Sequence, residues 1–173
     1  MIKLLKKYPY TTLFVLILLV SFIAIFVSER IGIPEDKLEQ DVGKSAKIPD
    51  DWNLAKAVSD DAAVLLYYND AREMCKIFVY TKHKNAFGYF FAQSESFDYT
   101  LPSFADGVQR ADIGENSIAF VSMNGAEYTS IVTDNGVIRT TYEVNPDEPF
   151  VVIVPKNSGE IKFYKDETAF ELM

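Results

Sequence analysis

Apolar residues follow two patterns in this chain: one long continuous run near its start, and short alternating segments from residue 62 onward. Residues 13–27 read LFVLILLVSFIAIFV, and residues 8–27 are twenty consecutive positions without a formal charge. A helix rises about 1.5 Å per residue, so this run spans roughly 30 Å, the thickness of a bilayer core. The run predicts a single transmembrane helix over residues 8–27.

From residue 62 the apolar residues recur with a period of two, and turn residues separate the segments. This pattern is typical of antiparallel strands, and Asn-Gly pairs at 124–125 and 135–136 suit tight hairpins with positive φ. We therefore expect an all-β domain, an antiparallel β-sandwich of about eight strands. The run at 150–154 is apolar throughout, which predicts a central strand. The predicted strands are 62–68, 75–81, 86–92, 117–123, 128–133, 137–144, 150–154 and 160–164.

The segment between these two regions is charged and rich in Gly and Pro, a composition that predicts a stalk between membrane and domain. Within it, Pro34 provides a start for a short helix that Gly43 would end. Residues 51–58 (DWNLAKAV) predict another short helix, just before the first strand. The expected organisation is a cytoplasmic tail (1–7), a transmembrane signal-anchor (8–27), a charged stalk (28–50) and an extracytoplasmic β domain (51–173).

Charges on either side of the apolar run predict its orientation. The tail before it carries only Lys3, Lys6 and Lys7, whereas the charges after it are mixed with acids in excess. Basic residues stay on the cytoplasmic side, so the C-terminal domain is expected outside the cytoplasm. The alternative is a cleaved secretory signal, but Phe26 and Val27 interrupt the small residues that cleavage needs, which favours an uncleaved anchor in the cell membrane.

Composition excludes some classes of partner. The formal net charge of −8 includes the three N-terminal lysines, so residues 28–173 carry 14 basic and 25 acidic side chains, net −11. Such a surface repels phosphate backbones, and we expect no nucleic-acid binding. The one cysteine, Cys75, cannot form an internal disulfide, and at the start of an apolar strand it is expected to be a small buried hydrophobe.

Candidate chemistry is sparse. The single histidine, His83, lies between Lys82 and Lys84, where we expect an exposed turn and neither a metal ligand nor a base. Phosphate-loop, dinucleotide, Gly-x-Ser-x-Gly and His-Glu-x-x-His signatures are absent from the sequence. We therefore predict no catalytic residue, no cofactor and no metal site, and a protein that is not an enzyme.

Residues 94–116 are the segment without strong periodicity, and a loop of 23 residues is unusual in a compact domain. It is either a functional loop or a place where a short strand or helix goes unrecognised. As a loop, it would offer aromatic rings beside carboxylates to a basic peptide, a sugar, calcium or a partner domain. The alternatives are that the rings tuck under a sheet edge and that the acids form a solvated face. The candidate interaction residues are Phe97, Asp98, Tyr99, Phe104, Asp106 and Asp112.

The anchor, the charged stalk, a GYFF strand (88–91) and a DNG hairpin (134–136) together resemble small uncharacterised membrane-anchored proteins of Gram-positive bacteria. The resemblance implies no activity and no catalytic residues. The leading hypothesis is a non-enzymatic extracytoplasmic interaction domain, tethered to the membrane, with a protein partner in the envelope. The alternatives are a ligand- or calcium-binding sensory domain that uses residues 94–116, and an enzyme based on carboxylates such as Asp98, Asp106 and Asp112.

Overall fold

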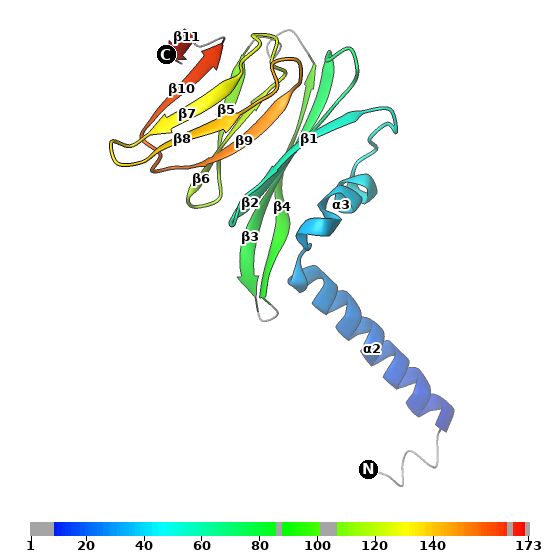
Figure 1. Cartoon of the computed structure of the whole chain (residues 1–173). Coiled ribbons are helices and arrows are strands. Elements are labelled where there is room, and N and C mark those ends of the chain that lie inside the picture. The colour runs from blue at the N-terminus through cyan, green and yellow to red at the C-terminus, as the bar shows by residue number, and fades with distance from the viewer. Residues whose placement is uncertain (1–8, 86–87, 101–106, 166–167, 172–173) are drawn as a thin grey trace.

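A computed structural model describes residues 9–85, 88–100, 107–165 and 168–171, and for some of these it describes the backbone alone. Helix α2 (Pro9–Ile31) comes first and projects away from a domain made of β-strands (Figure 1). Residues 13–20 of α2 are all apolar and 53–61% exposed. Within the described residues, no helix has the length and hydropathy of a membrane span.

The strands of the described residues form three antiparallel sheets, which confirms the expected mostly-β antiparallel fold. The first sheet has the order β1-β2-β3-β4, the central sheet β5-β6-β9, and the outer sheet β11-β10-β7-β8. The first sheet contains β1 (Asn53–Val58), β2 (Ala62–Tyr68), β3 (Met74–Asn85) and β4 (Gly88–Thr100). The central sheet contains β5 (Val108–Ile113), β6 (Ser117–Ser122) and β9 (Phe150–Pro155). The outer sheet contains β7 (Ser130–Asp134), β8 (Arg139–Glu143), β10 (Glu160–Lys165) and β11 (Thr168–Glu171).

The central sheet is covered on both faces, because successive side chains of a strand point to opposite sides. In β6, Ala119 and Val121 join a core cluster with the first sheet, whereas Ile118 and Phe120 join a second cluster with the outer sheet. Strand β9 divides its side chains in the same way, which explains its continuous apolar run. The prediction of a central strand over residues 150–154 is nevertheless wrong, because β9 lies at the edge of the β5-β6-β9 sheet and β6 is the central strand. The three sheets therefore lie in layers (Figure 1).

A short helix covers the remaining face of the first sheet. The 3₁₀ turn η1 (Glu35–Lys37) leads into α3 (Leu38–Ser45), which lies beside β1–β4 in Figure 1. Leu38 is 3% exposed and Val42 is fully buried, and both pack against a cluster that includes Leu65 and Phe78. This corrects the expectation of a spacer over residues 28–50, because the α3 part of that segment belongs to the folded domain.

One predicted helix is wrong, and of the two alternatives for residues 94–116 the structure supports unrecognised strands. Residues 51–58 were expected to be helical, but β1 pairs with β2 along its whole length, from Asn53 opposite Tyr68 to Val58 opposite Ala63. The short apolar sequence of these residues is compatible with a helix or a strand, and pairing with β2 makes it a strand. Residues 94–116 contain the end of β4 and all of β5, so this segment hides strands.

The two Asn-Gly pairs have different outcomes. The pair at 135–136 lies in the β7–β8 hairpin, where Gly136 has a φ of 81°, as predicted. The pair at 124–125 has the expected positive φ, 56° at Asn124, but it joins β6 to β7, which lie in different sheets. The first prediction is confirmed, and the second turn is a crossover between sheets and not a hairpin.

Candidate functional site

The structure places the six candidate interaction residues in separate regions. Phe97, Asp98 and Tyr99 lie on β4, where their backbones pair with β3, and their side chains are outside the described part of the chain. Phe104 and Asp106 lie outside the described residues altogether. Asp112 is an exposed residue of β5 in the central sheet, 3.6 Å from the guanidinium of Arg110.

Two other residues singled out by the sequence are described. Cys75 is 3% exposed and packs in the cluster between the first and central sheets, so its predicted burial is confirmed. His83 is exposed, as expected, but it lies on β3 opposite Phe90 and not in a turn, and its Nε2 is 2.9 Å from the Thr81 hydroxyl. Where side chains are described, no three His, Cys, Asp or Glu residues are grouped as metal ligands would be.

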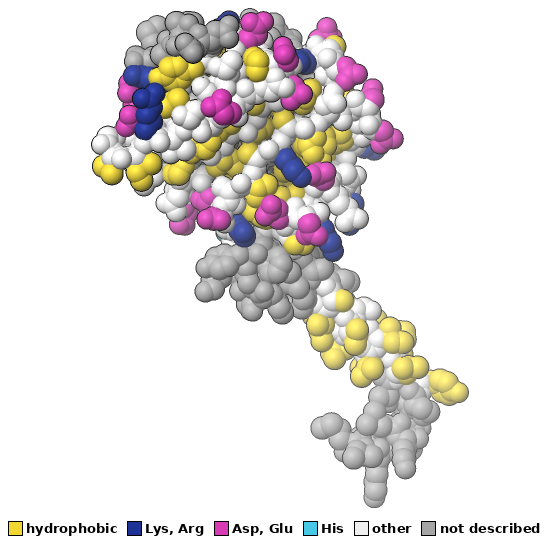
Figure 2. Space-filling view, in the orientation of Figure 1, with side chains coloured by type: hydrophobic (Ala, Val, Ile, Leu, Met, Phe, Trp, Pro, Cys, Tyr) yellow, Lys and Arg dark blue, Asp and Glu magenta, His cyan; other side chains and the backbone are white. Residues whose placement is uncertain are grey.

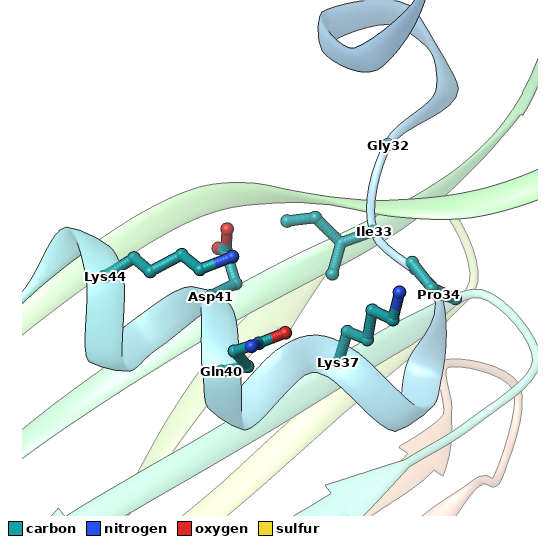
Figure 3. A pocket seen from close by; sticks show the side chains of 7 residues that line it. All are labelled: Gly32, Ile33, Pro34, Lys37, Gln40, Asp41 and Lys44. Carbon is teal, nitrogen blue, oxygen red and sulfur yellow. The ribbon is translucent and has the colours of Figure 1, made fainter.

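A hollow of about 480 Å³ opens where α2 meets the domain. One wall is the strap, residues 32–34. The other wall carries Lys37 at the end of η1 and Gln40, Asp41 and Lys44 of α3 (Figure 3). Residues three, four and seven apart share one face of a helix, so these four side chains face the strap while Leu38 and Val42 on the other face enter the core. The charged composition of residues 28–50 predicts a stalk here, and no sequence pattern indicates the hollow.

Backbone hydrogen bonds fix the strap to the sheet. The N–H of Ile33 donates to the carbonyl of Phe91 (2.7 Å), and the N–H of Phe91 donates to the carbonyl of Ile33 (2.9 Å). The pair is an isolated antiparallel bridge on the open edge of β4. Gly32, with a φ of 79°, lets the chain turn from α2 into this bridge without steric strain. The wall of the hollow is therefore held in place by the sheet.

Side-chain bonds hold the opposite wall. The hydroxyl of Tyr80 donates to Oδ2 of Asp41 (2.9 Å), and burial together with this bond raises the pKa of Tyr80 above its usual range. Tyr80 is fully buried, so its hydroxyl connects α3 to the interior of the first sheet. Lys56 of β1 forms an ion pair with Glu39 at the surface. These contacts keep α3, and with it Lys37 and Lys44, in a defined position.

A second surface feature is an apolar hairpin tip, defined as Val137 and Ile138 between β7 and β8. The two side chains are 89% and 62% exposed. The turn is held by Oδ1 of Asn135, which accepts from the N–H of Val137 (3.0 Å) and from the N–H of Ile138 (2.8 Å). Figure 2 shows apolar side chains at this end of the domain, on the opposite side from α2. The sequence signal for this feature is a Val-Ile pair directly after a turn sequence, which the alternating pattern places at the start of the predicted strand 137–144.

Comparisons of this chain with protein-family models, with curated proteins and with solved structures find no match.

Proposed function

We propose that this chain is a single-pass membrane protein in which α2 is the anchor and the β domain lies outside the cytoplasm. One observation carries the proposal: residues 13–20 are eight consecutive apolar side chains, each more than half exposed. Eight residues make more than two helical turns, so the exposed apolar surface surrounds the helix. A helix that is apolar all round needs an apolar environment, and its 23 residues reach about 34 Å at 1.5 Å per residue.

We also infer that the packing unit of the domain is a β-sandwich made by the first and central sheets. Its support is their shared core, in which Val64 and Leu66 of β2 meet Ala119 and Val121 of β6. The outer sheet then adds a third layer to that unit.

The domain's proposed activity is to contact a protein partner without catalysis. The hairpin tip supports this proposal because Val137 and Ile138 are large apolar side chains held in the open by an ordered turn. An exposed apolar side chain that is rigid loses little conformational entropy when a partner covers it. The tip faces away from α2, which leaves it accessible to another envelope protein (Figure 1).

Cysteine accessibility tests the membrane topology. The natural Cys75 is first replaced by Ala, and then either Lys3→Cys or Asn157→Cys supplies a single thiol. A membrane-impermeant maleimide should label the Asn157→Cys protein in intact cells, and the Lys3→Cys protein only after permeabilisation. Labelling of both in intact cells, or recovery of the protein in the fraction that alkaline washing releases from membranes, would contradict the proposal.

Site-specific photo-cross-linking tests the partner. A photoreactive amino acid at Val137 should capture one abundant envelope protein in intact cells, which mass spectrometry identifies. The same amino acid at Asp70, in the exposed turn between β2 and β3 of the first sheet, should not capture it. Equal capture at both positions, or none at Val137, would remove the tip as the contact surface.

A further inference from the structure

We propose that the hollow between the strap and α3 binds the phosphate headgroup of an anionic lipid from the leaflet in which α2 ends, with Lys37 and Lys44 as the contacting side chains. The inference rests on the proposed insertion of α2. It assigns a ligand to a site that no sequence pattern predicts. Four features of the described residues support it: height, charge, shape and rigidity.

The height of the hollow matches the headgroup layer. The apolar run ends at Val27, and the strap begins at Gly32, so four helical residues lie between them. At about 1.5 Å per residue they raise the strap roughly 6 Å above the hydrocarbon core. A bilayer of about 40 to 45 Å with a core of about 30 Å has headgroup layers of roughly 5 to 8 Å. The first residues of the hollow therefore lie level with lipid phosphates.

The charge of the hollow is opposite to that of the domain around it. Residues 28–173 carry a net charge of −11, whereas the lining of the hollow holds two lysines and one aspartate. In Figure 3 the side chains of Lys37 and Lys44 extend to the side of α3 that faces the strap. Lysine ammonium groups bind phosphate as point charges, so an anion is favoured here over the rest of the acidic surface.

The shape of the hollow suits a headgroup with its glycerol. A volume of about 480 Å³ is in the range of small-molecule sites. Ile33 and Pro34 add apolar surface beside the lysines, and Gly32 at the membrane end has no side chain to obstruct entry. The apolar and cationic parts of the lining thus correspond to the two ends of a lipid's polar region.

The walls are fixed before any lipid binds. The strap is bonded to Phe91 through its backbone, and α3 is bonded to the first sheet through Asp41 and Tyr80. Tyr80 also keeps the one carboxylate of the lining directed toward the sheet, since Asp41 accepts its hydroxyl. A preorganised site spends little of its binding energy on ordering its own groups.

The test is native mass spectrometry of the full chain, inserted in nanodiscs of equal phosphatidylcholine and phosphatidylglycerol and then released. The wild type should retain phosphatidylglycerol over phosphatidylcholine by roughly fivefold or more, since each lysine near an anionic lipid surface contributes measurably to the binding free energy. The Lys37→Gln/Lys44→Gln double variant should lose most of this enrichment. Its control, Lys47→Gln/Lys165→Gln, removes the same charge outside the hollow and should keep it.

Each other outcome overturns a specific statement. Equal retention of both lipids by the wild type, or full enrichment in the Lys37→Gln/Lys44→Gln variant, contradicts the lipid site while leaving α2 in the membrane. Displacement of the retained lipid by millimolar inorganic phosphate would make the hollow a site for free phosphate and contradict the lipid. Failure of the full chain to enter nanodiscs of either composition contradicts the proposed function itself.

Discussion

At the scale of single residues, Asp61 connects two sheets. It lies between β1 and β2, and its Oδ1 accepts from the hydroxyl of Ser59 (2.9 Å) and from the hydroxyl of Ser117 at the start of β6 (2.5 Å). Burial of the Asp61 carboxyl raises its pKa. These hydrogen bonds and others from the backbone together lower the pKa by more than burial raises it, so the pKa lies below its usual value. The charged form therefore stabilises the contact between the first and central sheets.

This lowered pKa gives the protein a pH dependence at acid pH. A group whose pKa is lower in the folded state contributes stability above its unfolded pKa of about 3.9, and that contribution disappears as the pH falls through the folded value. We expect Asp61→Asn to lower the melting temperature at pH 7 and the difference from wild type to shrink below about pH 4. Thermal unfolding at both pH values measures it. Asp112→Asn, at an exposed carboxyl, is the control and should leave the melting temperature unchanged at pH 7.

Asn124 is the second residue on which the fold depends locally. It is 1% exposed, and its Nδ2 donates to the carbonyls of Tyr128 (3.1 Å), Asn145 (2.8 Å) and Pro146 (3.2 Å). Asn124→Ala should lower the free energy of unfolding by about 3 kcal/mol, because it leaves partly buried carbonyls without their donor and keeps a positive φ that alanine disfavours. Denaturant unfolding measures the change. Asn157→Ala, in an exposed turn, should stay within about 0.5 kcal/mol of wild type, and equal losses would show that Asn124 is not special.

At the scale of elements, two turns need glycine for different reasons. Gly136 in the β7–β8 hairpin and Gly159 between β9 and β10 both have positive φ, 81° and 74°. A Cβ at Gly136 meets open space, whereas one at Gly159 would lie 2.2 Å from the carbonyl oxygen of Asp134. The β9–β10 turn therefore packs against the end of β7, and glycine there permits a close approach between backbones.

This difference predicts unequal effects of one substitution. Gly136→Ala should cost about 1 to 2 kcal/mol, the penalty of a left-handed conformation alone. Gly159→Ala should cost at least about 2 kcal/mol more, because the backbone of β7 or of the turn must also move. Chemical denaturation of both variants gives the comparison. An equal loss of stability in the two variants would mean that the β9–β10 turn can move away from the end of β7 without further cost.

A helix or strand could be predicted where the pattern of apolar residues indicated both its secondary structure and its burial. Strand β2 has the predicted bounds, residues 62–68, because turn residues frame an apolar segment. Strand β1 was missed because its six residues are apolar enough for either a strand or a helix turn, and β2 supplies the hydrogen-bonding partner. Helix α3 was expected to be part of a solvated stalk, since its charges outnumber Leu38 and Val42, the two side chains that enter the core.

At the scale of the whole molecule, the domain is coupled directly to α2. The bridge between Ile33 and Phe91 begins two residues after the helix ends, so little chain between them is free to move. With α2 in a membrane, this coupling would set the height and tilt of the domain and would point the hairpin tip away from the bilayer (Figure 1).

Removing the bridge between Ile33 and Phe91 should increase the motion of the β domain relative to α2. Ile33→Pro eliminates the N–H that donates to Phe91, and we expect a broader distance distribution between α2 and the domain. Pulsed electron paramagnetic resonance measures it with spin labels at Tyr10→Cys and Asn157→Cys, in a Cys75→Ala background in nanodiscs. Ile33→Val keeps the N–H and should keep the wild-type distribution. An unchanged distribution in Ile33→Pro would show that α3, and not the strap, holds the domain.

The sequence by itself determined the local features: an apolar helix at the start, period-two strands, the hairpin at 134–136, the burial of Cys75 and a strand at residues 150–154. Each depends on neighbours in the chain or on how apolar a segment is. Only the tertiary structure decided that the described strands form three sheets, that 53–58 is a strand, that α3 packs on β1–β4 and that a hollow forms against the strap. An apolar pattern shows which face must be covered, but the covering element comes from elsewhere in the chain.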